Sequence, residues 1–385
     1  MAYYFLYPQK DSTIYSHPSR KQTNTGGDEI LEIVKERGGS DSKYHPSRIL
    51  IAFKNEEIQT VINNIIGSST FNNGTSKVLL NLYTSEPINL SDVLNLEVFA
   101  SSLSWTEGKG KYLNLPSASS GVTWVNRDGS INGTAWPTAS FTAGTTGSVM
   151  NSTELTQGGG NWFTGSGFQT SQQFYNETTL DTSFDVTTIV QKHSASLFAN
   201  SAYPDGIQNN GFLIKQPDSI ETNTTSSFGQ LKYFSSNTHT IYPPKLCFKW
   251  DDSVHNFQSS AKMTGELNVT LYRNKQEYNQ NDEALFKIHI RDKYPTRTFT
   301  TTSNYLNVGY FTTSSFYSIR DAATEEEVIP FDDNFTKLSA NADGMFFKLY
   351  MKGLQPERYY RVLFKHINDD GTIIYDDDYY FKVVR

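Results

Sequence analysis

The chain has 385 residues, enough for two or three ordinary domains that can each bury a core without metals or disulfides. Its formal net charge is −7 and it has no dense basic run, so nucleic acid is not expected as a partner. Hydrophobic residues make up 37% and aromatic residues 14%, with 23 Tyr and 25 Phe, a balance that favours half-buried strands over helical bundles.

The start of the chain does not read as a secretion signal, because residues 1–10 contain no basic segment, no long apolar segment and no small-residue cleavage site. No apolar stretch approaches the roughly 20 residues that a membrane-spanning helix needs, so no membrane partner is expected. The single cysteine, Cys247, cannot form an intramolecular disulfide and is expected in a buried strand.

Strand-like runs dominate the first part of the chain. They lie at residues 28–36, 48–53, 78–83, 94–100, 211–215 and 245–250, many of them flanked by Gly, Asn, Asp, Ser or Pro. Residues 48–53 are read as apolar on both faces, which predicts an inner strand. In residues 94–100, Leu94, Leu96 and Val98 alternate with other side chains, which predicts one buried face.

One helix interrupts these strands. Asn55 is the expected N-cap, two glutamates follow it, and apolar residues recur at helical spacing from Ile58 to Ile66 before Gly67. This pattern predicts one short amphipathic helix that closes an end or a face of a sandwich.

From about 112 to 172 the composition shifts to Gly, Ser, Thr and Asn, which predicts an enlarged insertion. A compact domain rarely carries so long an irregular stretch unless the loop contacts something. The alternative is that much of it pairs as short strands that the sequence does not reveal. Residues 126–172 have few aliphatic side chains, so we expect them to gain their order from a neighbouring subunit.

Residues 252–263 have little periodicity and are interpreted as a linker, so we predict domains at 1–262 and 263–385. The second domain alternates again. Phe286, Ile288 and Ile290 are expected on one face of a strand, Tyr360, Val362 and Phe364 on one face of another, and residues 369–371 (Asp-Asp-Gly) make a hairpin turn before 372–384. Short strands at this spacing predict an immunoglobulin-like or fibronectin-type sandwich.

Three stretches of the first domain together resemble the DNRLRE-type β-sandwich, a carbohydrate-binding-module-like fold of surface and secreted proteins. They are DSTIY at 11–15 with TNTGG at 23–27, ILEIV at 30–34 and SRILI at 47–51; residues 98–103 with SWTEG at 104–108 and GVTW at 121–124; and FDVTTIV at 184–190 with NNGFLIK at 209–215. The resemblance covers roughly residues 1–250 and implies a large, jelly-roll-like β-sandwich.

At the other end, GLQPERYYRV at 353–362 is similar to the corner before the penultimate strand of fibronectin type III domains, where a tyrosine ties down the corner. Tyr359 or Tyr360 would have that role here. The expected fold class is therefore all-β, a large sandwich with one short helix followed by an Ig-like sandwich. The combination resembles virion structural proteins of contractile-tailed phages, which by analogy implies a tail, baseplate or neck protein assembled in the host cytoplasm.

The sequence contains few signals of catalysis or metal binding. The seven histidines form no zinc motif, and Gly158-Gly-Gly160 lacks the strand-before, helix-after setting of a phosphate loop, so it is read as a flexible turn. Carboxylates gather at 251–252, 332–333, 369–370 and 376–378, where oxygen ligands could hold calcium, but solvated acidic turns and edges are the preferred interpretation. No cofactor is expected.

Large aromatic residues stand isolated in the polar insertion and are the candidate contact residues. These are Trp124, Trp136, Phe141, Trp162 and Phe163. They would serve as anchors of an interface with other virion subunits in an oligomeric assembly, or the tryptophans as a stacking platform for a host surface glycan. Core packing is the plainer alternative.

The leading hypothesis is thus a non-catalytic virion structural protein. A carbohydrate-binding surface-recognition module is the alternative, and a polysaccharide depolymerase with two facing carboxylates is a minor one.

Overall fold

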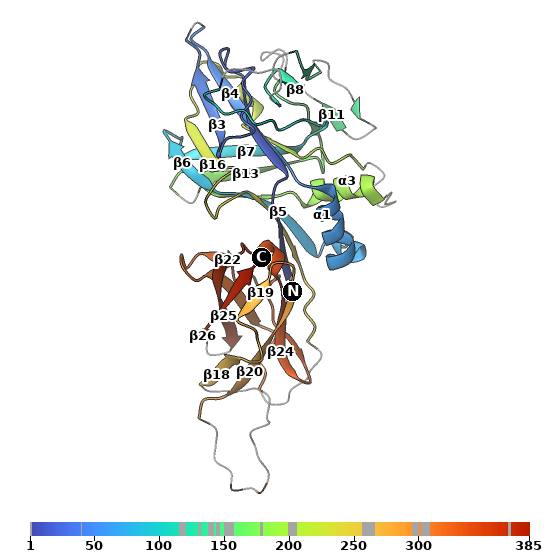
Figure 1. Cartoon of the computed structure of the whole chain (residues 1–385), viewed down its shortest axis with the longest axis vertical. Helices are drawn as coiled ribbons and strands as arrows, with labels where there is room; N and C mark the ends of the chain where they lie inside the picture. The colour runs from blue at the N-terminus through green and yellow to red at the C-terminus, as the bar shows by residue number, and fades with distance from the viewer. Residues whose placement is uncertain are drawn as a thin grey trace. The chain divides into compact units, whose positions relative to one another are not determined.

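The computed structural model describes residues 2–39, 41–114, 121–129, 132–137, 142–143, 147–149, 158–177, 180–198, 206–255, 266–294, 299, 301, 309–368 and 371–385. Strands dominate the described chain, as Figure 1 shows, and helices are few. The predicted all-β, sandwich-like class is confirmed.

The chain divides into two compact units. The N-terminal unit comprises Leu6–Asn72 and Lys77–Cys247, and the C-terminal unit comprises Met1–Phe5, Asn73–Ser76 and Phe248–Arg385. The domain boundary predicted after residue 262 falls within 256–265, outside the described residues.

The largest sheet has eight strands and belongs to the N-terminal unit. Its order is β13-β7-β15-β4-β3-β16-β6, and β2 also pairs with β4. The bounds are β2 (Lys10–Tyr15), β3 (Ile30–Arg37), β4 (Tyr44–Ala52), β6 (Thr84–Ile88), β7 (Val93–Ala100), β13 (Gln169–Tyr175), β15 (Phe212–Lys215) and β16 (Gln230–Phe234).

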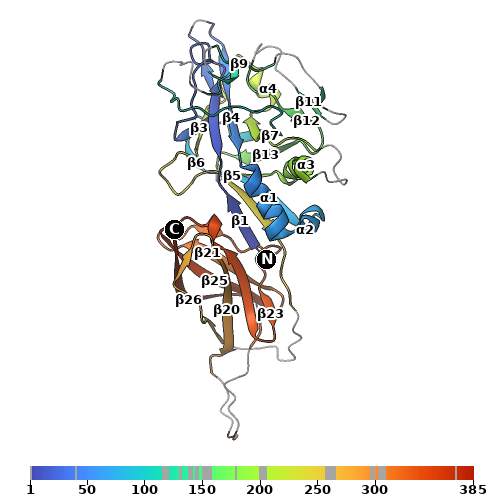
Figure 2. The same cartoon turned by 45° about the vertical axis from the view of Figure 1, so that its right-hand side comes forward.

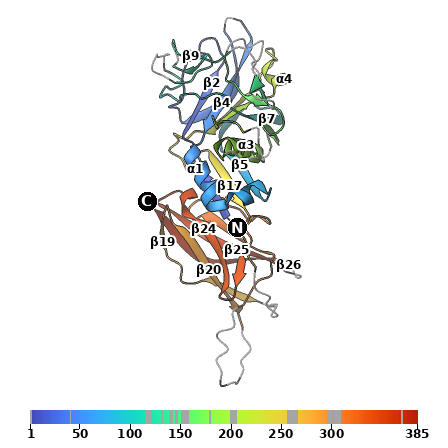
Figure 3. The ribbon, with the colours of Figure 1, turned by 90° about the vertical axis from the view of Figure 1, so that its right-hand side faces the viewer.

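The predicted inner strand is β4. It pairs with β15 on one side and with β2 and β3 on the other, and Figure 3 shows β2 running beside it. In β7, Leu94, Leu96 and Val98 are buried as the alternation predicted. Phe99 is buried as well, because the opposite face of this sheet is also covered.

A second, four-stranded sheet has the order β1-β17-β5-β14. The bounds are β1 (Ala2–Leu6), β5 (Ser76–Leu82), β14 (Thr182–Asp185) and β17 (Lys245–Trp250). The expectation for Cys247 is confirmed, since it lies buried in β17.

The described part of the insertion forms short strands, which was the alternative to an irregular loop. They are β8 (Asn126–Asp128), β9 (Thr134–Ala135), β10 (Thr142–Ala143), β11 (Gly147–Val149) and β12 (Phe163–Thr164). β8 pairs with β9, and β10, β11 and β12 form a three-stranded sheet. The predicted dependence of residues 126–172 on a neighbour remains a prediction, and residues 130–131, 138–141, 144–146 and 150–157 lie outside the described set.

The predicted helix is more irregular than expected. It is α-helical in α1 (Asn55–Thr60), becomes a π-helix in η1 (Val61–Ile66), and Gly67 ends it with a φ of 87°. The cap is Lys54 instead of Asn55, and no side chain caps the helix. A third segment, α2 (Ser68–Asn72), follows directly, as Figure 2 shows.

The expectation of one short helix is wrong, because α3 (Thr187–Phe198) and α4 (Asp218–Glu221) are helical too. Residues 184–190 are therefore not one strand. β14 ends at Asp185, whose carboxylate accepts hydrogen bonds from the backbone N–H and the hydroxyl of Thr187 at 3.1 and 2.6 Å. This is the polar contact that starts α3.

The C-terminal unit contains two antiparallel-rich sheets. One has the order β18-β20-β24-β23 and the other β19-β26-β25-β21-β22. The bounds are β18 (Leu267–Leu271), β19 (Glu277–Asn279), β20 (Glu283–Asp292), β21 (Ser315–Asp321), β22 (Glu327–Ile329), β23 (Ser339–Asn341), β24 (Gly344–Tyr350), a 3-10 turn η3 (Met351–Gly353), β25 (Arg358–Asn368) and β26 (Gly371–Val384).

Stacked aromatic rings join these two sheets into a sandwich. Phe286 of β20 stacks on Phe347 of β24 at 4.9 Å between ring centroids, and Phe347 stacks on Tyr317 of the other sheet at 4.2 Å. The buried faces are those that the alternation predicted, and β25 and β26 pair as a hairpin with Asn368 opposite Gly371. Within the described ranges, no helix is long and apolar enough to cross a membrane.

Candidate functional site

One face of the eight-stranded sheet brings charged side chains together in the middle of the N-terminal unit. Ile214 of β15 pairs with Ile49 of β4. The next residues along this register are therefore Lys215 and Arg48, which lie side by side on the other face. Lys215 in turn pairs with Glu97 of β7. Two cations thus stand next to each other inside a sheet, and both are fully buried.

All three nitrogens of the Arg48 guanidinium donate hydrogen bonds. Its Nε and Nη2 donate to the two carboxylate oxygens of Glu221 at 3.1 and 2.6 Å. Its Nη1 donates to the carbonyl of Gly159 at 2.6 Å. Glu221 ends α4 and is itself fully buried, so this fork-to-carboxylate pair fixes α4 and the segment around Gly159 to the sheet.

Two tryptophan rings cover the same guanidinium. The Arg48 Cζ atom lies 4.7 Å from the ring centroid of Trp124 and 4.8 Å from that of Trp162. An arginine is attracted by the electron-rich face of an indole ring, and more strongly where water is excluded. The buried cation is therefore compensated by a carboxylate, a carbonyl and two aromatic rings.

The aromatic residues predicted as contact anchors lie in the core. Trp124, Trp136 and Trp162 are 2–3% exposed and belong to one apolar cluster with Trp105. Trp136 donates its indole N–H to the carbonyl of Thr123 at 3.0 Å. Phe163 is buried too, and Phe141 lies outside the described residues.

The described aromatics therefore do not form the exposed stacking platform or the surface anchors that their isolation in the sequence suggested. The reason is that backbone segments far apart in the chain fold over one face of the sheet, and their few large side chains fill the space between.

Three successive glycines let one of these segments approach the sheet. Gly158, Gly159 and Gly160 all have positive φ angles, from 83° to 104°, and all are buried. A Cβ on Gly159 would lie 2.5 Å from Arg48 Nη1 and 2.7 Å from the Trp124 ring. The segment that was interpreted as a flexible turn is thus a packed element, and glycine is needed because any side chain would displace the arginine.

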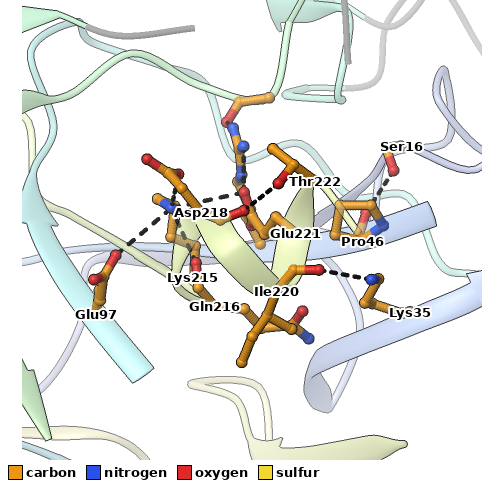
Figure 4. A network of polar contacts seen from close by, with 12 residues as sticks. Ser16, Lys35, Pro46, Glu97, Lys215, Gln216, Asp218, Ile220, Glu221 and Thr222 are labelled. Atoms are coloured by element: carbon orange, nitrogen blue, oxygen red, sulfur yellow. Dashed lines mark hydrogen bonds and ion pairs between the residues drawn. The ribbon is translucent and has the colours of Figure 1, made fainter. Parts of the chain in front are cut away.

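Lys215 continues the cluster, and Figure 4 shows its ammonium group linked to Asp218 and Glu97. Its Nζ donates to Asp218 at 2.6 Å and to the Gln216 carbonyl at 2.9 Å, and it lies 3.7 Å from both Glu97 and Glu221. The Asp218 carboxylate is 60% exposed, so the cluster runs from a dry interior to water.

The carboxyl of Glu97 is at the edge of this arrangement. Burial raises its pKa above the usual range, although the Lys215 ammonium acts in the opposite direction. We call Arg48, Lys215, Glu221, Asp218 and Glu97 together the buried charge cluster.

A second cation secures the end of α4. Lys35 of β3 donates to the carbonyls of Ile220, at 2.7 Å, and Asn223, as Figure 4 shows for Ile220. These carbonyls lie at and just beyond the helix C-terminus, where a positive charge is favourable. Burial lowers the pKa of Lys35, while the Glu221 carboxylate opposes that shift.

A separate buried carboxyl lies on β2. Asp11 accepts a hydrogen bond from the backbone N–H of Ser236 at 2.6 Å, and its own N–H donates to Glu107 at 2.9 Å. Burial raises the pKa of Asp11 to about 7, and the nearby Glu107 adds to that rise. The neighbouring Lys10 lies over the Trp105 ring at 4.3 Å from its centroid.

The acidic segments considered for calcium have other partners. Asp251 accepts hydrogen bonds from the backbone and hydroxyl of Ser253, and Asp376 pairs with Arg361. Asp332 accepts from the backbone of Asn334 and from the hydroxyl of Tyr3. No group of three His, Cys, Asp or Glu side chains that could hold a metal occurs among the residues described, and residues 369–370 are outside them.

The arrangement of the buried charge cluster favours stabilisation over chemistry. Each of its cations is bonded to a carboxylate, and the fully buried members are shielded by tryptophans and by backbone. Sequence reasoning missed it because Arg48 begins a run read as apolar, and Lys215 ends another. The available signal was Arg48 at the start of a predicted inner strand, because a cation buried there requires a buried anion elsewhere in the chain.

No protein-family model matches the chain, and no curated protein is significantly similar to it.

Proposed function

We propose that this chain is a non-catalytic structural subunit of a tailed-phage particle, in which its β units serve as rigid scaffolds for contacts with other subunits. The observation that carries the proposal is the internal use of its charged and aromatic groups. Arg48, Lys215 and Glu221 are consumed in fastening α4 and the glycine segment to the sheet, under Trp124 and Trp162. Charged residues that hold α4 and the glycine segment on the sheet make the N-terminal unit rigid.

The surface offers further support. Exposed apolar and aromatic side chains occur on strands of both units, including Val93 and Tyr175 in the N-terminal unit and Tyr359, Ile374 and Tyr380 in the C-terminal unit. Rigid strands with exposed side chains are suited to contacts between preformed surfaces.

The proposal is tested on particles purified by density gradient from the culture that produces the protein. Quantitative mass spectrometry should find its peptides in the particle fraction at a fixed ratio to the major structural proteins. Its presence only in the soluble fraction would overturn the proposal.

A glycan array probed with the full chain separates the two alternatives. Binding in the micromolar range would favour a carbohydrate-recognition module. In a separate assay, a depolymerase would lower the viscosity of a polysaccharide solution, and substitution of one catalytic carboxylate would abolish that effect. Array binding is not expected, because the rings of Trp124, Trp136 and Trp162 are buried.

A further inference from the structure

The strand β13 ends the eight-stranded sheet of the N-terminal unit. It pairs with β7 over its whole length, from Gln169 opposite Phe99 to Tyr175 opposite Val93. It is the terminal strand of the sheet in the described chain. The side chains of Gln169, Ser171 and Gln173 are exposed, so this edge is open to solvent on one face.

The hydrogen bonds that flank β13 show which backbone groups point away from β7. Ala100 N–H donates to the Phe168 carbonyl at 2.9 Å, and Asn176 N–H donates to the Asp92 carbonyl at 3.0 Å. In an antiparallel ladder every second residue bonds to the neighbour, so the even-numbered residues of β13 face β7. The N–H and C=O groups of Ser171 and Gln173 therefore point away from β7, to the side where no other described strand pairs with β13. Apart from β7, the nearest described strand is β14, whose Ser183 N–H donates to the Gln172 side chain at 3.0 Å and leaves the backbone groups of Ser171 and Gln173 for a partner.

The composition of β13 leaves this edge without the usual protection. Its sequence, Gln-Thr-Ser-Gln-Gln-Phe-Tyr, carries no charge and no proline. The opposite edge strand of the same sheet, β6, contains Glu86 and Pro87. Charged residues and prolines are common means of preventing edge-to-edge pairing, so β6 is guarded and β13 is not.

We infer that β13 pairs antiparallel with β13 of a second copy of this chain. A two-fold axis through Gln172 places Ser171 opposite Gln173 of the second copy, and Gln173 opposite Ser171 of the second copy. Each of these pairs exchanges the outward N–H and C=O groups. Because the strand is neutral, self-pairing places no like charges opposite each other, whereas two copies of β6 would bring their glutamates together.

This inference rests on the proposed function only in that it names one subunit contact, and the two can fail separately. A monomeric chain found in particles would leave the function and overturn the contact. A dimeric chain that is absent from particles would support the contact and overturn the proposed function.

The test measures self-association of the full chain by sedimentation velocity over a series of protein concentrations. The wild-type chain should dimerise. The variant S171K/Q173K places lysine opposite lysine across the axis twice, and should raise the dimer dissociation constant by at least about tenfold. The variant S171E/Q173E should do the same. Mixing the two variants should restore association, because each lysine then faces a glutamate.

The matched control is S85K/S226K, which adds the same charge at two exposed serines of the same unit, one of them on β6. It should dimerise like the wild type, and circular dichroism should show all three variants folded. A wild-type chain that stays monomeric, or a dimer that S171K/Q173K leaves unchanged, overturns the inference. Weakening by both double variants without rescue on mixing overturns the antiparallel register.

Discussion

At the scale of single residues, Arg48 and Glu221 form a fully buried ion pair in the N-terminal unit. Both side chains are fully buried and joined by two hydrogen bonds. A buried ion pair is weak evidence of net stabilisation, because desolvation offsets much of the attraction. Removing one partner alone, however, leaves the other charge buried and uncompensated.

We therefore predict that Glu221→Gln lowers the free energy of unfolding of this unit by about 3–5 kcal/mol. Lys215, 3.7 Å from Glu221, loses the same anion and adds to the loss. The double variant R48M/E221L should lose less than E221Q, since it removes both charges and keeps apolar volume. Urea unfolding followed by tryptophan fluorescence measures the effect, because four of the five tryptophans lie in this unit.

The control is Glu86→Gln, which breaks the pair between the exposed Glu86 and the partly exposed Lys232. It should change the free energy of unfolding by less than about 1 kcal/mol. Equal losses for E86Q and E221Q would contradict the assigned role of burial.

His193 predicts a dependence of stability on acid. The imidazole is fully buried on α3, and neither ring nitrogen has a hydrogen-bond partner among the described residues. Burial lowers its pKa to about 3, from about 6.5 in the unfolded chain. Between these values the unfolded state binds the proton and the folded state does not. Stability is therefore lost as pH falls below about 6.5, by up to about 1.4 kcal/mol per pH unit.

The variant His193→Phe keeps a ring beside Phe212, 5.7 Å away, and removes the titration. The difference in free energy of unfolding between H193F and wild type should grow in favour of H193F as pH is lowered from 7 toward 4. Asp11, with its raised pKa, acts in the opposite sense in both proteins and cancels in the difference. His239→Gln, at a side chain 90% exposed, should keep the wild-type pH profile.

At the scale of elements, a comparison of Gly159, in the glycine segment 158–160, with Gly67 separates the cost of backbone strain from the cost of a steric clash. Gly159 and Gly67 have similar positive φ angles, 83° and 87°. Alanine at Gly67 meets only Thr70 at 4.0 Å, so G67A should cost about 1–2 kcal/mol from strain alone. Alanine at Gly159 meets Arg48 and Trp124 below 3 Å, so G159A should cost at least about 2 kcal/mol more. Equal costs in urea unfolding would show that the segment can move aside.

The corner of the C-terminal unit gives a second prediction at this scale. Tyr360 is buried and its hydroxyl donates to the Gln355 carbonyl at 2.9 Å, whereas Tyr359 is 57% exposed. Of the two tyrosines that the sequence proposed, Tyr360 thus ties the corner. Tyr360→Phe should lower the free energy of unfolding by about 1 kcal/mol, and Tyr359→Phe by less than about 0.5 kcal/mol. Fluorescence of Trp250, which belongs to this unit, reports the transition.

How far the sequence could be read also differs between elements. Period-two alternation located β7, β20 and β25, because one side of each strand faces a core. α3 was missed because its first turn, Thr187 to Val190, is rich in β-branched residues, and only Asp185 before it signalled a cap.

The partners within the buried charge cluster could not be read from the sequence, although a cation at an inner strand signals that a buried anion exists. Its members lie on β4, β7, β15 and α4, between residues 48 and 221, and only sheet register brings them together. The tryptophans were recognised as important, but their burial depends on loops whose path has no local signal.

At the scale of the whole molecule, the C-terminal unit is discontinuous in sequence. It includes residues 1–5, which contact residues near the other end of the chain. Tyr4 packs against Tyr350 with ring centroids 5.8 Å apart, and Tyr3 donates its hydroxyl to Asp332 at 3.1 Å. Phe5 lies against Gly353, where a Cβ would be 2.4 Å from its ring. The N-terminal residues thus complete a core formed by residues more than 300 positions away.

We predict that Tyr4→Ala destabilises the C-terminal unit by about 3–5 kcal/mol, because it leaves a cavity beside Tyr350 in a well-packed core. Hydrogen exchange of the full chain should show faster exchange in peptides from β24 and η3, which contain Tyr350 and Gly353. The control is Tyr294→Ala in the same unit, at a side chain 77% exposed, which should leave exchange in those peptides unchanged. If Y4A and Y294A gave the same exchange pattern, residues 1–5 would be an appendage of this unit and not part of its core.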